Sequence, residues 1–88
     1  GYFLEPTIFL DPPTDAEIWT EEVFGPVLSV RRFGKEDEAV VAANDSRFGL
    51  GAAVMGADHE QLHRVARRLR AGIVWINCSQ LTFSEAPW

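Results

Sequence analysis

Short apolar segments alternate with helical patterns along this chain, and this alternation constrains the fold more than any other feature of the sequence. One stretch carries apolar residues at the i, i+3, i+4 and i+7 spacing of a buried helix face: Leu62, Val65, Ala66 and Leu69. A capping box of Asp58 and Gln61 precedes it, and Gly72 stands where a helix stop is expected. The apolar run 73–76 that follows predicts a strand.

The rest of the chain repeats these strand and helix signals. Apolar, aromatic and β-branched residues predict strands over three further ranges: 2–10, 27–33 and 50–55. Thr14 and Glu17 form a capping-box pattern that predicts a short helix, and the acidic start of 35–44 suits the positive end of a second helix dipole. This order predicts an α/β fold, a parallel-sheet βαβαβ segment covered by helices.

Composition and charge exclude several classes of protein. The chain has 88 residues, 47% of them hydrophobic and 24% charged, which is typical of a globular unit with a marginal core. A net charge of −5 disfavours nucleic acid and anionic membranes as partners. No apolar run approaches the ~20 residues that cross a bilayer. The single cysteine cannot form an internal disulfide and suits a reducing, intracellular setting.

Both ends of the sequence suggest a longer protein. It starts at Gly1 without an initiator Met or a leader, and it stops at Trp88, a large aromatic residue with no polar tail after it. We therefore expect the 88 residues to be a segment that is truncated at both ends.

Cys78 is the only thiol and is the first candidate for a nucleophile, with His59 or His63 as its base. The predicted topology argues against this pair, because the histidines lie near the start of a helix and Cys78 follows the next strand, which we expect at the opposite end of the layer. A structural cysteine and solvated histidines are the simpler interpretation. Two histidines four residues apart lack a convincing third ligand, so no metal site is predicted.

Four arginines crowd one segment and are the candidate site for a phosphate group: Arg64, Arg67, Arg68 and Arg70. A simpler interpretation is that they complement the negative end of the helix dipole and keep the outer face soluble. Ligands of parallel sheets usually bind beyond the carboxyl ends of the strands, which directs attention to Gly34, Gly56 and the residues from Asn77 onward.

The segment 21–26 has the most chemical promise. In extended backbone Glu22 and Phe24 point to the same side and Glu21 points to the other. A carboxylate is suited to accepting hydrogen bonds from a vicinal diol such as a ribose, and an aromatic ring beside it can contact a heterocycle. A solvated acidic turn is the alternative interpretation, and composition does not decide between the two.

At this segment the sequence resembles the aldehyde dehydrogenase superfamily, and the resemblance extends over essentially the whole chain. Its motifs follow in family order: 1–3 with 5–7, 21–27, 43–46 with 48–50, and 71–72 with 74–78. The tail 77–80, leading to 86–88, is most similar to the betaine aldehyde and aminoaldehyde dehydrogenase branch found in plants and related organisms.

The resemblance implies that residues 1–88 are a C-terminal part of the catalytic domain. The parent enzyme would oxidise betaine aldehyde or aminoaldehydes to the corresponding acids with NAD or NADP, betaine aldehyde leading to glycine betaine. A cysteine nucleophile and a glutamate base serve this reaction in the family, and the resemblance places both upstream of Gly1, so no catalytic residue is expected here. Cys78 matches a non-catalytic position.

The resemblance also implies the roles of four residues. Glu22 matches the glutamate that binds the nicotinamide ribose, and Phe24 matches the aromatic beside the nicotinamide. Trp88 matches an aromatic of the aldehyde tunnel, and Ile73 acts indirectly from behind it. Because position 73 is small in members that accept the bulky trimethylammonium aldehyde, Ile73 favours primary aminoaldehydes.

Two alternatives stay open: a stand-alone α/β binding module without catalysis, and an aldehyde dehydrogenase for another substrate class. The parent protein is expected to bind a small-molecule aldehyde and to form a homodimer or homotetramer. Its expected compartment is the cytoplasm, or the plastid or peroxisome if it comes from a plant or alga.

Overall fold

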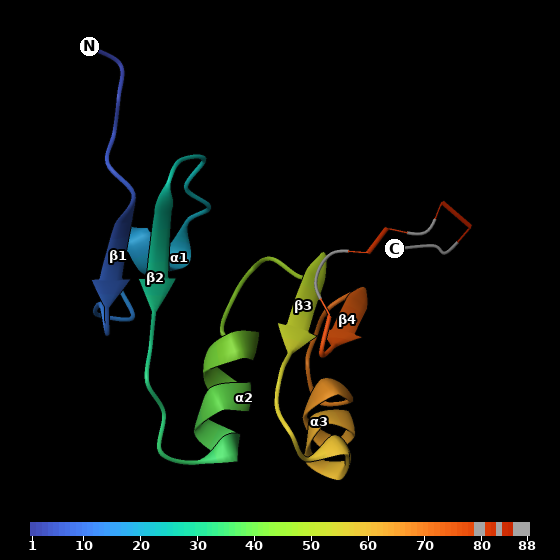
Figure 1. The fold of residues 1–88 in the computed structure, drawn as a ribbon. Helices are drawn as coiled ribbons and strands as arrows, with labels where there is room; N and C mark the ends of the chain where they lie inside the picture. Colours follow the sequence, from blue (N-terminus) through green and yellow to red (C-terminus); the bar gives the residue numbers. More distant parts are fainter. Residues whose placement is uncertain (79–80, 83, 86–88) are drawn as a thin grey trace. The chain divides into compact units, whose positions relative to one another are not determined.

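The computed structural model describes residues 1–78, 81–82 and 84–85. They form two compact units, Gly1–Gly34 and Lys35–Trp88. Figure 1 shows both units, and each contains one pair of parallel strands. The elements of the first unit are β1 (Thr7–Leu10), α1 (Glu17–Thr20) and β2 (Val27–Val30). Those of the second are α2 (Glu36–Asn44), β3 (Gly51–Val54), α3 (His59–Ala66) and β4 (Ile73–Ile76).

In the first unit β1 and β2 pair in register from Thr7 opposite Val27 to Leu10 opposite Val30. The predicted strand 2–10 is shortened at its start, where Pro6 has no N–H to donate to a ladder. The Ser29 hydroxyl of β2 donates to the Ile18 carbonyl of α1 at 3.0 Å. This bond ties the short helix to the strand pair.

The predicted start of α1 is wrong. Its N-cap is Ala16, which has no capping side chain. The N–H of Ala16 donates to the Pro13 carbonyl at 3.1 Å, so Thr14 lies inside a turn instead of capping the helix.

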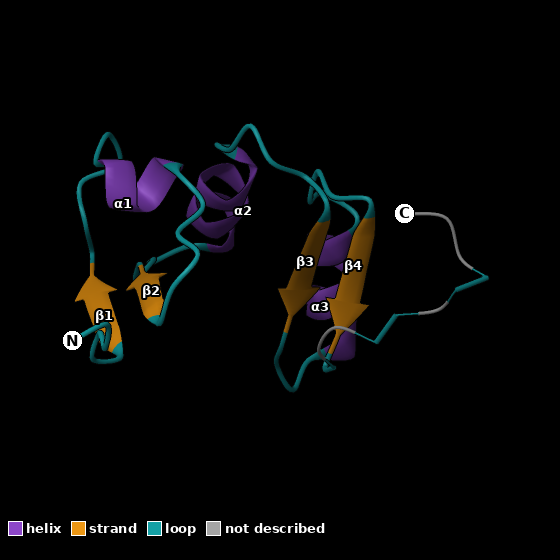
Figure 2. Cartoon of the chain, turned by 90° about the horizontal axis from the view of Figure 1, so that it is seen from above, coloured by secondary structure: helices purple, strands orange, loops and turns teal. Residues whose placement is uncertain are grey.

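In the second unit β3 and β4 pair from Gly51 opposite Ile73 to Val54 opposite Ile76, and α3 contacts both strands (Figure 2). The predicted cap is confirmed, because Asp58 Oδ1 accepts a hydrogen bond from the Gln61 N–H at 3.1 Å. The helix ends at Ala66, earlier than the predicted stop at Gly72. Turn bonds such as that from the Arg68 N–H to the Val65 carbonyl replace its last predicted turns.

The predicted α/β class and the parallel pairing of strands are confirmed. The strands pair two by two, so the described residues form two two-stranded parallel sheets where the sequence pattern suggested one continuous βαβαβ sheet. Apolar periodicity marks which face of a strand is buried and carries no information on which strand lies next to it.

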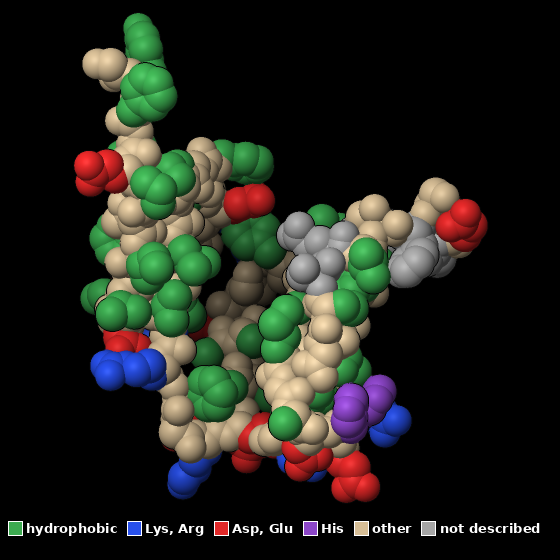
Figure 3. Space-filling view, in the orientation of Figure 1, with side chains coloured by type: hydrophobic (Ala, Val, Ile, Leu, Met, Phe, Trp, Pro, Cys, Tyr) green, Lys and Arg blue, Asp and Glu red, His purple; other side chains and the backbone are tan. Residues whose placement is uncertain are grey.

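Burial is limited in both units. Val40 on α2 and Leu62 on α3 are the buried hydrophobic residues in the described part of the chain, at 5% and 4% exposure. Figure 3 shows many apolar side chains on the surface, and the exposed large ones include Tyr2, Phe3, Ile8, Leu10, Leu28, Phe33 and Met55. This agrees with the marginal core expected from the length. Among the described helices none has the length and apolar character to cross a membrane.

Candidate functional site

The segment between α1 and β2 carries the two predicted cofactor residues on its surface. Glu22 and Phe24 are both exposed, and residue Phe24 as a whole is 93% accessible. Two tight turns shape the chain beyond Glu22: the Gly25 N–H donates to the Val23 carbonyl at 3.0 Å, and the Val27 N–H donates to the Gly25 carbonyl at 2.8 Å. An exposed carboxylate and an exposed ring, two residues apart, are therefore available to a ligand.

This segment lies at the amino ends of the first strand pair. The Pro26 carbonyl accepts a hydrogen bond from the Thr7 N–H at 2.9 Å, directly before both strands begin. The rule that ligands bind beyond the carboxyl ends of parallel strands therefore does not lead to Glu22 and Phe24. Their chemistry fits one end of a dinucleotide, because the carboxylate can accept from a diol and the ring offers a flat apolar surface.

The carboxyl ends of the second strand pair are joined by Asn77. Its Oδ1 accepts from the Gly56 N–H at 2.9 Å, and its Nδ2 donates to the Gly56 carbonyl at 3.0 Å. Asn77 has a φ of 52°, in the left-handed region that asparagine tolerates better than most residues. The structure thus brings together Gly56 and Asn77, two of the three positions that the carboxyl-end rule singled out, while Gly34 belongs to the other unit.

The structure describes one of the two predicted substrate residues. Ile73 begins β4, is half-buried and lies opposite Gly51. Trp88 lies outside the described residues, so its contact with Ile73 stays a prediction.

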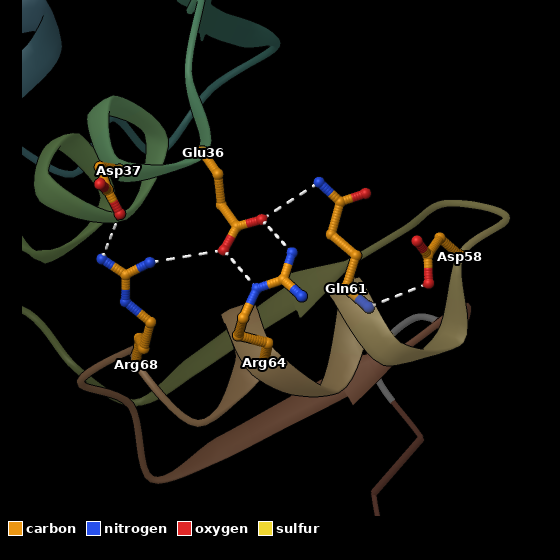
Figure 4. Close-up of polar contacts among 6 residues, drawn as sticks. All are labelled: Glu36, Asp37, Asp58, Gln61, Arg64 and Arg68. Carbon is orange, nitrogen blue, oxygen red and sulfur yellow. Dashed lines mark hydrogen bonds and ion pairs between the residues drawn. The ribbon is translucent and has the colours of Figure 1, made fainter.

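Two of the clustered arginines bind acidic residues of α2 (Figure 4). Arg64 contacts Glu36 through two bonds, Nε to Oε1 at 2.9 Å and Nη2 to Oε2 at 2.7 Å. Arg68 Nη2 contacts Asp37 Oδ1 at 2.7 Å, and Gln61 Nε2 donates to Glu36 Oε2 at 3.2 Å. The cluster joins α2 to α3, which supports a structural role over phosphate binding. The helix-dipole interpretation had not identified these partners, because they lie about thirty residues earlier in the sequence.

Replacing Glu36 with glutamine is expected to make stability less dependent on pH. Hydrogen bonds from Arg64 and then from Gln61 lower the pKa of Glu36 from 4.5 to about 2. Because the folded-state pKa is depressed, the stabilisation is complete well above pH 4.5 and is lost as the pH falls towards 2. Urea unfolding of the full-length protein should give a lower midpoint for Glu36→Gln at pH 7, and the gap to wild type should narrow below about pH 4.5.

Glu17→Gln is the matched control, since Glu17 is likewise the first residue of a helix. It should not reproduce the pH-dependent gap. If the difference in urea midpoint between Glu36→Gln and wild type stayed constant from pH 7 to pH 3, this result would contradict the assigned role of the Glu36 carboxylate.

The structure corrects the argument about Cys78 and the histidines. Asp58, which caps α3, follows Gly56 by two residues, and Gly56 is bonded to Asn77 beside Cys78. The start of α3 and the end of β4 therefore share one edge of the unit, and the expectation of opposite ends was wrong. His59 and His63 are exposed and Cys78 is a half-buried free thiol. Across residues 1–78, 81–82 and 84–85 no group of three or more potential metal ligands is present.

Comparison with known proteins gives a consistent result along the whole chain. The profile of the aldehyde dehydrogenase family matches residues 1–88. The chain is 60% identical over 88 residues to aminoaldehyde dehydrogenase 2, peroxisomal, of Malus domestica, and 53% identical to betaine aldehyde dehydrogenase, chloroplastic, of Amaranthus hypochondriacus. Each match covers 100% of this chain and 18% of the relative.

Solved structures agree with these matches. The betaine aldehyde dehydrogenase of Staphylococcus aureus in complex with NAD+ superimposes with a TM-score of 0.93 at 46% identity, over 100% of this chain and 18% of that one. The chain thus spans about a fifth of the length of the proteins it matches. On the family match and the structural agreement over all 88 residues, the chain belongs to the aldehyde dehydrogenase family.

Proposed function

We propose that this chain is the C-terminal part of the catalytic domain of an NAD(P)-dependent dehydrogenase that oxidises aminoaldehydes or betaine aldehyde to the corresponding acids. The observation that carries the proposal is the identity of 53–60% over all 88 residues to enzymes named for these substrates. The chain spans 18% of those relatives, so the full-length protein performs the reaction. The catalytic cysteine and glutamate lie outside this chain in the proposal.

The proposed contribution of this chain to the cofactor comes from Glu22 and Phe24. The cofactor accepts a hydride when bound, and the Glu22 carboxylate accepts hydrogen bonds from the hydroxyls of the nicotinamide ribose. Phe24 supplies an apolar surface beside the nicotinamide. The exposure of both side chains and the turns that follow Glu22 support this role.

The substrate preference is proposed to depend on Trp88 and Ile73. The indole of Trp88 contacts the cationic end of the aldehyde, an interaction that contributes about 0.5–2 kcal/mol. Ile73 limits the space behind that indole and favours primary aminoaldehydes over the trimethylammonium group of betaine aldehyde. The half-buried position of Ile73 on β4 supports an indirect role.

Ile73→Ala in the full-length enzyme is expected to raise kcat/KM for betaine aldehyde by about 2- to 30-fold, the range of a cation–π contact restored to a bulky cation. Efficiency with 3-aminopropionaldehyde should change less. Ile76→Ala is the matched control, because three positions along the strand place the two side chains on opposite faces. Unchanged betaine aldehyde kinetics in Ile73→Ala would contradict the proposal that Ile73 disfavours betaine aldehyde.

The assay that tests the activity itself uses the full-length protein with 3-aminopropionaldehyde, betaine aldehyde and acetaldehyde, each with NAD+ and with NADP+. Reduction of the cofactor with the first two substrates supports the proposal and identifies the preferred cofactor. Preference for acetaldehyde would indicate another substrate class, and absence of any turnover would favour a binding module.

Compartment and assembly are further parts of the proposal. The relatives of Malus domestica and Arabidopsis thaliana are named peroxisomal and chloroplastic, which favours the peroxisome or plastid if the source is a plant or alga, and the cytoplasm otherwise. The full-length protein is proposed to be a homodimer or homotetramer. Sedimentation velocity measures the size of the assembly and distinguishes the two.

A further inference from the structure

Ser29 of β2 holds α1 against the first strand pair. The hydroxyl of this half-buried residue donates to the main-chain carbonyl of Ile18 at 3.0 Å. Main-chain carbonyls at the end of a helix need donors from outside the helix, and Ser29 supplies one of them. The bond therefore fixes the position of the helix relative to the strand.

Helix α1 depends on such contacts because it is short and has no capping side chain. It spans Glu17–Thr20, about one turn, and its N-cap is Ala16. One turn is not stable by itself, since the first turn of a helix costs more conformational entropy than its hydrogen bond offsets. A second contact comes from Arg31, directly after β2, whose guanidinium lies 5.8 Å from the centroid of the Trp19 ring. The contacts to β2 and to the residue after it thus hold α1 in place.

The segment that carries the proposed cofactor residues begins where α1 ends. We define residues 21–26 as the cofactor segment. Its first residue, Glu21, donates its N–H to the Glu17 carbonyl at 2.9 Å and so continues directly from the helix. At its other end the Pro26 carbonyl accepts from the Thr7 N–H at 2.9 Å. The strand pair therefore holds one end of the cofactor segment directly and the other end through α1.

We propose that Ser29 is a positioning residue for the dinucleotide, acting through α1 on Glu22 and Phe24. The inference rests on the proposed function, in which Glu22 binds the nicotinamide ribose and Phe24 lies beside the nicotinamide. Glu22 follows Ile18 by four residues, and the residues between them belong to α1 or to its C-cap. Loss of the Ser29 hydroxyl lets α1 move relative to β2, so the two cofactor residues occupy their binding positions for a smaller fraction of the time.

Ser29→Ala in the full-length protein tests this role, because it removes the hydroxyl and keeps a small residue in the strand. We expect KM for the preferred dinucleotide, NAD+ or NADP+, to rise about 2- to 12-fold, the range of one net hydrogen bond. Its dissociation constant in calorimetry should rise by a similar factor. KM for 3-aminopropionaldehyde and kcat should stay within about twofold, since general destabilisation would not act on one substrate alone. Ser29→Thr keeps a hydroxyl at the same carbon and should restore the dinucleotide KM.

Hydrogen–deuterium exchange gives a readout that does not depend on activity. The N–H groups of Thr20 and Glu21 donate to main-chain carbonyls within the turn of α1, so they should exchange faster in Ser29→Ala. Peptides from α3 should exchange as in wild type, because α3 belongs to the other compact unit. Unchanged exchange of residues 17–26 would overturn the anchoring role of Ser29.

Thr20→Ala is the matched control, because it removes a hydroxyl from α1 itself. The Thr20 hydroxyl donates to the Ala16 carbonyl at 3.3 Å, and that carbonyl also accepts from the N–H groups of Trp19 and Thr20. This bond does not join α1 to β2, and alanine favours the helix. Thr20→Ala should leave the dinucleotide KM and the exchange of residues 17–26 as in wild type. A rise in KM equal to that of Ser29→Ala would overturn the specific role of the Ser29 bond.

A double variant tests whether Ser29 acts through the cofactor residues. Ser29→Ala should raise the dinucleotide KM by a smaller factor in a Glu22→Gln background than in wild type, because part of the contact that it positions is already weakened. Equal factors in the two backgrounds, or an unchanged dinucleotide KM in Ser29→Ala, would overturn the positioning role. Failure of the proposed function is separately visible, because wild type would then not reduce the dinucleotide with 3-aminopropionaldehyde. Calorimetric binding of NAD+ and the exchange of residues 17–26 still test Ser29 in that case.

Discussion

Glu22→Gln in the full-length protein is expected to raise KM for NAD(P)+ by about 10- to 100-fold, with a smaller loss in kcat. The amide has the size of the carboxylate but loses the charge, and a hydrogen bond to a charged acceptor contributes about 1.5–3 kcal/mol. At about 1.4 kcal/mol per factor of ten, this accounts for the expected range. KM for the aldehyde should change little, since Glu22 is proposed to contact the ribose of the cofactor and not the aldehyde.

The adjacent carboxylate provides the matched control for this variant. Glu21 caps the end of α1, and its N–H donates to the Glu17 carbonyl at 2.9 Å. In extended backbone its side chain points away from that of Glu22, so Glu21→Gln should leave cofactor kinetics nearly unchanged. Equal effects of the two variants, or unchanged cofactor kinetics in Glu22→Gln, would contradict the assignment of Glu22. Direct binding of NAD+ by calorimetry separates weaker affinity from slower chemistry.

Asn77→Ala is expected to destabilise the β3–β4 unit by about 2–3 kcal/mol, as the sum of two effects. The left-handed backbone at φ 52° costs alanine about 1–2 kcal/mol. The two hydrogen bonds to Gly56 add about 0.5–1.5 kcal/mol each, reduced here because water reaches the exposed side chain. The amide of Gly56, which donates to Asn77 Oδ1, should exchange with deuterium much faster in the full-length variant.

Two further variants separate the contributions at Asn77. Asn77→Gly removes the backbone cost and both side-chain bonds, so it should be more stable than Asn77→Ala and still expose the Gly56 amide. Asn77→Asp keeps an acceptor for the Gly56 N–H, so it should retain part of the protection, although it loses the bond to the Gly56 carbonyl. If the Gly56 amide exchanged equally in wild type and all three variants, the contact would have no role in stability.

Strand bounds and helix caps could be predicted from the sequence where they depend on residues only a few positions apart. The strand 73–76 has the predicted bounds, and Asp58 caps α3 as its spacing to Gln61 indicated. The start of α1 was mispredicted because Thr14 and Glu17 satisfy the capping pattern, while the turn at Pro13 and Ala16 takes up the residues between them. Caps depend on backbone geometry that a residue pattern suggests but does not enforce.

In the candidate site, too, some residues could be selected from the sequence and others are recognised only in the structure. Glu22 and Phe24 could be selected from residue type and two-residue spacing, and the structure places both side chains on the surface. Ser29 could not be selected, because only the position of the Ile18 carbonyl reveals the use of its hydroxyl.

The amino-acid sequence by itself determined the order of strands and helices, the cap of α3 and the resemblance to aldehyde dehydrogenases, because these depend on residue types at short spacings. Only the tertiary structure decided which strands pair, that Glu36 and Asp37 bind Arg64 and Arg68, that Trp75 bonds to the Leu81 carbonyl and that Asn77 bonds to Gly56. The physical reason is that a polar side chain can bond to many partners. The partner is decided by which segments the packing brings within hydrogen-bond distance.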